Sequence, residues 1–231
     1  MLAPSVDLLI IVDVLSFTTA VEVATARGAW VFPYPLRDQS AADFAAEHHA
    51  ILAANRREVS AERPYSLSPR SLATIPAGTR LVLPSPNGST LTTLASKTHL
   101  ILAGCLRNAR AVAKWAGVRS TIGVIAAGEV RPDGSLRYAI EDLLGAGAIL
   151  SHFPVEARSP EAEVAVAAFE RFADDLPRRL ADCASARELA AMGFAEDVAF
   201  AAELDVSNSV PTFLLGGVYA AEAGYEHVKP L

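Results

Sequence analysis

Four acidic residues are the side chains of this sequence best placed to do chemistry. Asp13 ends an apolar run, and no basic residue lies within ten positions on either side of it. Glu129 follows another apolar run, and Glu141 and Asp142 begin a helical pattern. A carboxylate at the end of a buried strand is costly unless something pairs with it. Because Mg²⁺ takes oxygen ligands and water, these four residues are predicted to bind it.

Each of these acids also has a purely structural interpretation. Asp13 could simply shape a turn, because the hydroxyl-rich stretch 16–19 that follows it offers N-cap candidates for a helix. Glu141 and Asp142 would be favourable in the first turn of any helix. The small residues 145–147 favour close packing of that helix against its neighbours. The pattern alone leaves both interpretations open.

The loop 85–90 has the composition of an anion-binding turn. Asn87 and Gly88 permit a tight turn. Ser89 or Thr90 can then cap the following helix, whose free N–H groups favour phosphate. The spacing is not that of a Walker P-loop. The alternative is an ordinary turn followed by an N-cap.

The elements that must position these residues alternate between strands and helices. The first apolar run is rich in β-branched residues, which is typical of a strand buried on both faces of a parallel sheet. The alternation predicts a three-layer α/β/α fold with a mainly parallel or mixed sheet. Polar clusters at the carboxyl ends of parallel strands would converge on one crevice. The predicted strands are 8–14, 30–34, 80–83, 99–103, 121–126 and 210–215, and the predicted helices are 18–27, 38–55, 108–115, 140–150 and one ending near Leu94.

Two stretches depart from this alternation. Residues 56–79 are polar and proline-rich, and they are predicted to form a long excursion before the sheet resumes. From 160 to about 204 the pattern is only helical, with breaks near a proline and a glycine. We predict a core over 1–158 that holds the strand-end site, and a helical section with a final strand over 159–231 that packs on it. A single domain over the whole chain is the alternative.

The remaining polar and sulfur-containing residues have ordinary interpretations. Asp197 and Asp205 flank a short helix and are predicted to be solvated acids. His48 and His49 are adjacent and point to different faces, so they are predicted to lie on a solvated edge and not to bind zinc. The two cysteines, at 105 and 183, have no metal or redox spacing and are predicted to be buried thiols of a reducing, cytoplasmic environment.

The composition limits the partners. The 231 residues carry a formal net charge of −6 and a pI near 5.4, which argues against nucleic acids and anionic membranes. No run of about 20 apolar residues is present, so we expect no transmembrane helix. The N-terminal run lacks a preceding basic region, so it is a poor signal peptide. The positive mean hydropathy of +0.29 favours a homodimer.

Taken together, the clusters resemble the 2-phosphosulfolactate phosphatase family of Mg²⁺-dependent phosphatases, which is named for a step in coenzyme M biosynthesis. No single piece is specific, but the ordered set spans nearly the whole chain. Family members usually carry a further segment before the first strand. The matching pieces are Val12-Asp13-Val14-Leu15 with Thr18-Thr19, Ser85-Pro86-Asn87-Gly88-Ser89, Leu106-Arg107-Asn108-Ala109 with Ala111-Val112-Ala113, Glu141 to Ile149, and Asp197-Val198 with Asp205 and Val210-Pro211.

The resemblance implies a phosphomonoester hydrolase that acts on a small phosphorylated acid. The implied catalytic residues are Asp13, Glu141 and Asp142, which would hold Mg²⁺, with Glu129 as an additional ligand. The implied phosphate-binding residues are Asn87, Gly88, Ser89, Asn108, Thr18 and Thr19.

One departure from the family bears on the substrate. Where the family commonly has Arg-Ala after Asp-Val-Leu, this chain has Ser16-Phe17. A guanidinium at that turn would be a natural partner for phosphate or sulfonate, and Arg107 or Arg131 is the predicted replacement. The alternatives are an anion-binding domain without turnover, and an enzyme of unrelated chemistry on a similar sheet.

Overall fold

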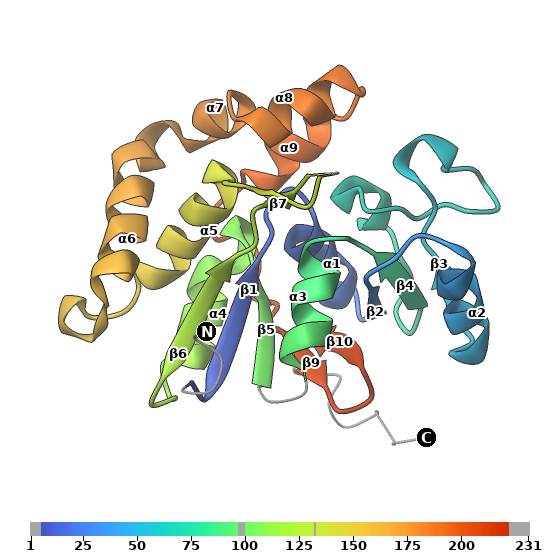
Figure 1. Cartoon of the computed structure of the whole chain (residues 1–231), viewed down its shortest axis with the longest axis horizontal. Coiled ribbons are helices and arrows are strands. Elements are labelled where there is room, and N and C mark those ends of the chain that lie inside the picture. Colours follow the sequence, from blue (N-terminus) through green and yellow to red (C-terminus); the bar gives the residue numbers. More distant parts are fainter. Residues whose placement is uncertain (1–5, 97–99, 132, 222–231) are drawn as a thin grey trace.

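One mixed sheet forms the centre of the molecule. The structure is a computed structural model that describes residues 6–96, 100–131 and 133–221. Within these residues, eight strands pair in the order β3-β4-β2-β10-β9-β5-β1-β6 (Figure 1). Two parallel groups, β3-β4-β2 and β5-β1-β6, are joined by the antiparallel pair β10-β9. The strands are β1 Leu8–Val12, β2 Trp30–Tyr34, β3 Ile51–Leu52, β4 Arg80–Pro84, β5 Leu100–Gly104, β6 Ile122–Ala126, β9 Pro211–Leu214 and β10 Val218–Ala221.

Helices cover both faces of this sheet, which confirms the predicted three-layer α/β/α fold. Helices α1 and α3 pack on one face of the β5-β1-β6 group, and α4 and α5 pack on the other (Figure 1). The helices of the described residues are α1 Phe17–Ala26, α2 Gln39–Glu47, α3 Gly88–Ala95, α4 Ala109–Ala116, α5 Ile140–Leu150, α6 Pro160–Phe172, α7 Leu176–Ala181, α8 Ala184–Ala191 and α9 Ala195–Ala201.

The strand β1 lies at the centre of the two-sided packing that the sequence predicts. All five of its residues are buried, because β5 and β6 pair with it in parallel on either side. Leu8 and Ile10 belong to an apolar cluster with α4 and α5, whereas Leu9 and Ile11 belong to a cluster with α1. Successive side chains of a strand point to opposite faces, so one short run fills both cores. The same strand places Asp13 at its carboxyl end, between the two helical layers.

The helical section packs on the same core as β1. Phe169, Leu180 and Val198 belong to the apolar cluster that contains Leu8. The predicted breaks are confirmed: Pro177 lies in the first turn of α7, where its missing N–H has no cost, and Gly193 separates α8 from α9. The division between 1–158 and 159–231 stays a prediction. Among the described residues, no helix has both the length and the apolar character that a membrane crossing needs.

The predicted helix over 38–55 is wrong beyond Glu47. Helix α2 ends there, and His49 has a φ of +48°, which cannot continue a right-handed helix. The apolar residues Ile51 and Leu52 instead form the edge strand β3, which pairs in parallel with β4. The helical periodicity of the sequence therefore did not decide the structure of these two residues, because pairing with β4 placed them in the sheet.

The predicted final strand over 210–215 is only the first of two. β10 follows β9 in a hairpin, and its Tyr219 is fully buried with its ring edge-on to Phe17 and Phe213. The Gly-Gly pair at 216 and 217 is a sequence signal for a hairpin, and the prediction of a single strand does not consider it. Residue 99, the predicted start of one strand, lies outside the described residues.

Candidate functional site

A tight turn after β1 holds Asp13 in place. The side chain is 5% exposed. Its Oδ1 accepts a hydrogen bond from the Phe17 N–H at 3.2 Å, and its Oδ2 accepts one from the Gly88 N–H at 3.0 Å. The Gly88 bond joins the end of β1 to the start of α3. The structure thus brings the two predicted strand-end clusters, at 13–19 and 85–90, into direct contact.

The two threonines of this turn fix the main chain around Asp13 through hydrogen bonds of their hydroxyl groups. The Thr18 hydroxyl accepts a bond from the Asp13 N–H and donates one to the Asp13 carbonyl, both at 2.9 Å. The Thr19 hydroxyl donates to the Val14 carbonyl at 2.7 Å. Both threonines are fully buried. Their hydroxyls therefore close the turn, and a direct contact with phosphate stays a prediction.

The first turn of α5 supplies the next two acids. Asp142 is buried, and its carboxylate accepts bonds from the Val14 N–H at 2.8 Å and the Gly128 N–H at 2.9 Å. It therefore ties the loop after β1 to the loop after β6. Glu141 is 3% exposed, and its buried Oε2 has no hydrogen-bond partner in the described part of the chain. A buried carboxylate oxygen without a partner is rare in proteins unless an ion or water completes it.

The acids of the site repel one another. The pKa of Asp13 is raised to about 6, mainly by burial and also by the negative charges of Glu129 and Glu141, against the opposing effect of the N–H groups of Phe17 and Gly88. Burial also raises the pKa of Asp142 well above its ordinary value, and Asp13 and Glu141 add to this. Carboxylates that are buried this close together are stabilised by a bound cation.

In the predicted anion-binding loop 85–90, several polar groups already bond to other parts of the protein and are not free for a ligand. The N–H of Gly88 is bound to Asp13, and a Cβ on Gly88 would lie 2.2 Å from the Phe17 ring, so only glycine fits there. The Ser89 hydroxyl is buried and donates to the Leu83 carbonyl at 3.1 Å. The Asn87 Oδ1 accepts a bond from the Val130 N–H at 3.2 Å. The loop therefore first serves to position Asp13.

Asn108 has its side chain fully engaged at the end of β5. Its Oδ1 accepts from the Cys105 N–H at 2.8 Å, and its Nδ2 donates to the carbonyls of Ala103 at 3.3 Å and Ser209 at 3.0 Å. The residue is completely buried. It joins β5 to the segment that precedes β9, and its predicted role toward phosphate or a carboxylate ligand stays a prediction.

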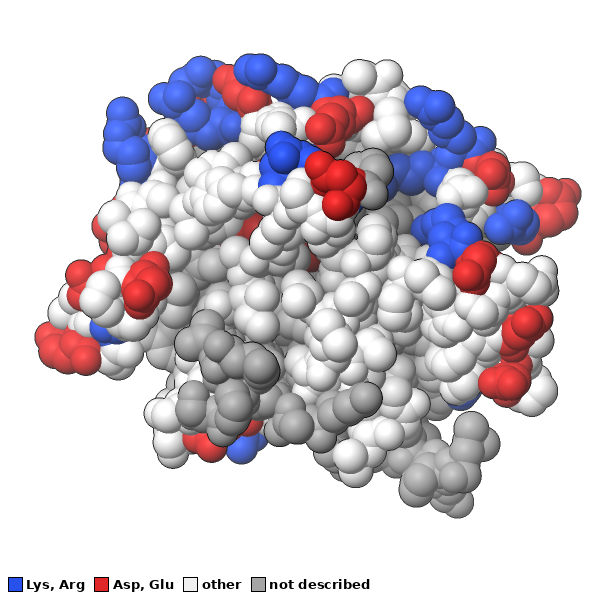
Figure 2. Space-filling view, in the orientation of Figure 1, with Lys and Arg blue, Asp and Glu red and all other residues white. Residues whose placement is uncertain are grey.

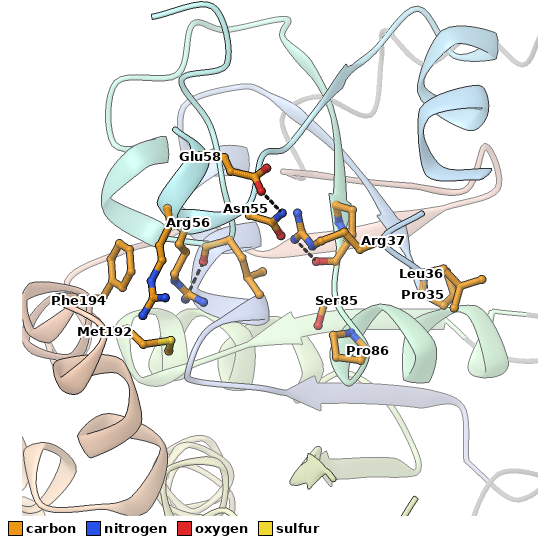
Figure 3. Close-up of a pocket in the computed structure, with 13 residues that line it drawn as sticks. Pro35, Leu36, Arg37, Asn55, Arg56, Glu58, Ser85, Pro86, Met192 and Phe194 are labelled. Atoms are coloured by element: carbon orange, nitrogen blue, oxygen red, sulfur yellow. Dashed lines mark hydrogen bonds between the residues drawn. The ribbon is translucent and has the colours of Figure 1, made fainter. Parts of the chain in front are cut away.

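Two adjoining cavities open beside Asp13. The smaller, of about 230 Å³, is lined by Asp13, Ser16, Asn87 and Glu129, the last of which lies in the short strand β7 Glu129–Val130. The larger, of about 700 Å³, is lined by three arginines (Figure 3), namely Arg37, Arg56 and Arg57. On the surface, basic side chains lie along one edge from α7 and α8 to the segment after β3, with acidic side chains among them (Figure 2).

Arg56 lines both cavities and is the functional candidate that the sequence patterns missed. Its Nη2 donates to the Ser16 hydroxyl at 2.6 Å and to the Leu67 carbonyl at 3.2 Å. Ser16 is the position where the family commonly has an arginine, so a guanidinium from another segment contacts that turn. The usable signal was the short apolar run 51–54, because polar residues directly after a strand are candidates for a strand-end site.

The two arginines predicted as replacements lie elsewhere. Arg107 pairs with Glu22 at 2.9 Å and stacks on Phe200 with its guanidinium 3.9 Å from the ring centroid. Arg131 lies in the turn between β7 and β8 Leu136–Arg137, where its N–H donates to the Ser135 carbonyl. Neither residue lines the two cavities. For Arg107 the predicted replacement of the turn arginine is wrong, because long-range pairing, which sequence spacing does not show, fixes its side chain elsewhere. For Arg131 it stays a prediction.

Asp197 is also not the solvated acid that the sequence predicts. It is 2% exposed, accepts a bond from the Ser68 hydroxyl at 2.6 Å, and has its Oδ2 3.5 Å from the Arg56 Nε. It projects from α9, so the helical section holds the arginine of the site. Asp205 is not the predicted solvated acid either, because its side chain is 12% exposed and pairs with Arg110, accepting from the N–H at 2.7 Å and lying 3.3 Å from the guanidinium.

Comparison with known proteins points to one family. The family model described as 2-phosphosulpholactate phosphatase matches residues 3–214. A curated relative named 2-phosphosulfolactate phosphatase, from Methanothermobacter thermautotrophicus, is 33% identical over 147 residues, which are 63% of this chain and 61% of the relative. A protein named probable 2-phosphosulfolactate phosphatase, from Carboxydothermus hydrogenoformans, is 28% identical over 136 residues, which are 58% of this chain and 55% of that protein.

The matched region thus spans somewhat more than half the length of these curated relatives. The family match covers nearly the whole chain and includes the acids, the loop 85–90 and α9 described above. The chain belongs to the 2-phosphosulpholactate phosphatase family.

Proposed function

We propose that this protein is a Mg²⁺-dependent phosphatase that hydrolyses the phosphate monoester of a small acid, with 2-phosphosulfolactate as the first candidate substrate. The observation that carries the proposal is the pairing of buried acids at one end of the site with an arginine-lined cavity at the other. The names of the family and of the two relatives support the same reaction. A cytoplasmic location and a homodimer remain predictions.

The acids suit a magnesium ion, which keeps several water ligands, better than a metal ion whose ligands all come from the protein. In the described ranges, no three acidic, histidine or cysteine side chains come together as a complete metal site. Mg²⁺ usually keeps several waters and takes only one or two carboxylates together with substrate phosphate oxygens. Asp13 lines the cavity, and Glu141 offers a buried oxygen without a partner, so these two residues are the proposed ligands. Glu129 is the additional candidate at the cavity wall.

The residues of the chain would divide the work as follows. Asp13 is held by two N–H groups, so its carboxylate has a fixed orientation and still has lone pairs for a ligand. Asp142 accepts a bond from each of the loops after β1 and β6, which fixes their relative position and so the walls of the site. Arg56 provides positive charge next to Asp13 for an anionic oxygen. Bound Mg²⁺ would neutralise charge on the phosphate and assist the attacking water.

Phosphate release from a panel of small phosphorylated acids tests this function. We expect release from 2-phosphosulfolactate or a related ester with Mg²⁺ and none with EDTA, because the acids alone would repel the phosphate. Tight binding of such acids without turnover by a folded, Mg²⁺-supplied sample would instead favour an anion-binding domain. Release that is equally fast with EDTA would contradict the metal dependence.

We also expect binding of Mg²⁺ to weaken at acidic pH. The pKa of Asp13 is raised from 3.8 to about 6, so the metal-free protein loses stability as the pH rises through this window. Mg²⁺ requires the ionised carboxylate and would offset that loss above pH 6. The rise in melting temperature on adding Mg²⁺ should therefore be larger at about pH 8 than at about pH 5. Equal rises at both pH values would contradict the role of Asp13 as a ligand.

A further inference from the structure

The two cavities of the site meet at Arg56 but differ in charge. The smaller has Asp13 and Glu129 in its wall, whereas the larger has Arg37 and Arg57. The walls have Arg56, Leu67, Ser85, Pro86 and Met192 in common, so the two cavities adjoin. A phosphate group bound beside Asp13 would leave the rest of its ester to extend past Arg56 into the larger cavity. That part of the site is positively charged.

Among the described residues, Arg37 is held at the wall of the larger cavity by backbone carbonyls and forms no ion pair with an acid. Its Nη1 donates to the Ala53 carbonyl at 3.2 Å. Its Nη2 donates to the Pro84 carbonyl at 3.1 Å, a bond that Figure 3 marks with a dashed line. These bonds fix the guanidinium without neutralising it. Burial lowers the pKa of Arg37, and the positive charge of Arg56 lowers it further, against the opposing effect of the Glu58 carboxylate. An anion between the two guanidiniums would relieve this repulsion.

Arg56 is paired with an acid, but within the described residues its Nη1 makes no hydrogen bond and remains a donor for a ligand. Its buried Nε has no hydrogen-bond partner within the described residues, although the Asp197 Oδ2 lies 3.5 Å away. Asp197 also accepts a bond from Ser68, so its charge is shared. The acid in the wall of the larger cavity, Glu58, is exposed, and its Oε1 accepts a bond from the Asn55 side chain at 2.9 Å.

We propose that Arg37 and Arg56 form the subsite for the second acid group of the substrate, a carboxylate or sulfonate close to the carbon that bears the phosphate. This inference rests on the proposed function, because the phosphate must lie beside Asp13 for the second group to reach the arginines. A planar guanidinium can present two parallel N–H donors to an oxyanion, which makes arginine the suitable residue.

The residue at position 16 fits this assignment. The short Ser16 side chain accepts a bond from Arg56, whereas an arginine at 16 would bring a second guanidinium to the same place. Selectivity for acid-bearing esters in this chain would then depend on Arg56, held by Asp197 of α9 and by Ser16, and on Arg37.

Equilibrium binding tests the subsite without requiring turnover. We would titrate 3-sulfolactate and lactate into the wild type and into the Arg37→Gln, Arg56→Gln and Arg56→Lys variants, with the exposed Arg119→Gln as the matched control. Each glutamine variant should weaken binding by about 10- to 100-fold, since a charge-assisted bond is lost. Arg56→Lys should recover part of it, and the control should match the wild type. If the variants lose more affinity for 3-sulfolactate than for lactate, the subsite binds the sulfonate. If they lose the same affinity for both, it binds the carboxylate.

Kinetics separate this inference from the proposed function. For the variants that turn over, we expect the ratio of kcat/KM for an acid-bearing ester to that for p-nitrophenyl phosphate to fall by about 10- to 100-fold, mostly through KM. If the wild type releases no phosphate from any ester, the proposed function fails, while arginine-dependent binding of 3-sulfolactate would still support the subsite. Unchanged binding in a folded Arg37→Gln variant would overturn the subsite, even if Arg56→Gln does not fold.

Discussion

Replacing Asp13 with asparagine is expected to lower kcat for phosphate release by at least about a thousandfold while the protein stays folded. The side chain is the acid that lies at the meeting point of β1, the loop 85–90 and the smaller cavity. Asparagine has the same shape but carries no charge, so it would bind Mg²⁺ poorly. The melting temperature of the variant should then no longer rise when Mg²⁺ is added.

The fold should tolerate this change because the charge of Asp13 is itself unfavourable. Burial and the neighbouring acids raise its pKa to about 6. Asparagine removes that penalty but can accept from only one of the two N–H groups of Phe17 and Gly88, so the two effects oppose each other. The exposed Asp43→Asn on α2 makes the same chemical change away from the cavities and should leave kcat unchanged. Near-wild-type hydrolysis by a folded Asp13→Asn protein would show that the site is assigned wrongly.

The position of Asp13 could be predicted because its signals are local. An apolar, β-branched run that ends in a single acid specifies both the buried strand and the place of the carboxylate. The same holds for α5, whose predicted bounds of 140–150 are those of the structure and whose first turn carries Glu141 and Asp142. In both cases hydrophobic periodicity and chain direction are enough to place a polar side chain at a strand or helix end.

The basic half of the site could not be predicted in this way. Arg56 follows a strand of only two residues, β3, whose pairing with β4 is a long-range contact. Its partners Ser16 and Asp197 are 40 and 141 positions away in the sequence. Hydrophobic periodicity contains no information on such pairs. In the sequence, the buried ion pair between Arg56 and Asp197 therefore looks like two separate solvated charges.

The roles of the smaller polar residues depend on backbone partners that no pattern shows. Thr18 and Asn108 have the composition expected of a phosphate site, yet their hydrogen bonds go to main-chain groups of the surrounding turns. A side chain that satisfies buried backbone groups and one that binds a ligand have the same donors and acceptors. Only the three-dimensional arrangement distinguishes them.

The second large effect is expected on stability, from Gly147→Ala in the middle of α5. In an exposed helix this change would stabilise by about 1 kcal/mol. Here the added Cβ would lie 2.1 Å from the Ala165 carbonyl oxygen and 2.8 Å from the Phe169 Cβ, both on α6. A backbone atom cannot move aside by a change of rotamer, so α6 must shift as a unit away from α5. We expect a net loss of about 3 kcal/mol in the free energy of unfolding and a fall of about 6–12 °C in melting temperature.

The matched control for this prediction is Gly117→Ala at the end of α4. Its backbone is already helical, and an added Cβ would have no neighbour closer than 3.4 Å, so the melting temperature should stay the same or rise slightly. The hydrogen bonds that Asp142 accepts from the loops after β1 and β6 hold the first turn of α5, so α6 is the element expected to move. Gly147→Ala should therefore keep its kcat at temperatures where it is folded. If it melts at or above the wild-type temperature, α5 and α6 do not pack this closely, and the second helical layer must be arranged differently around the acids of the site.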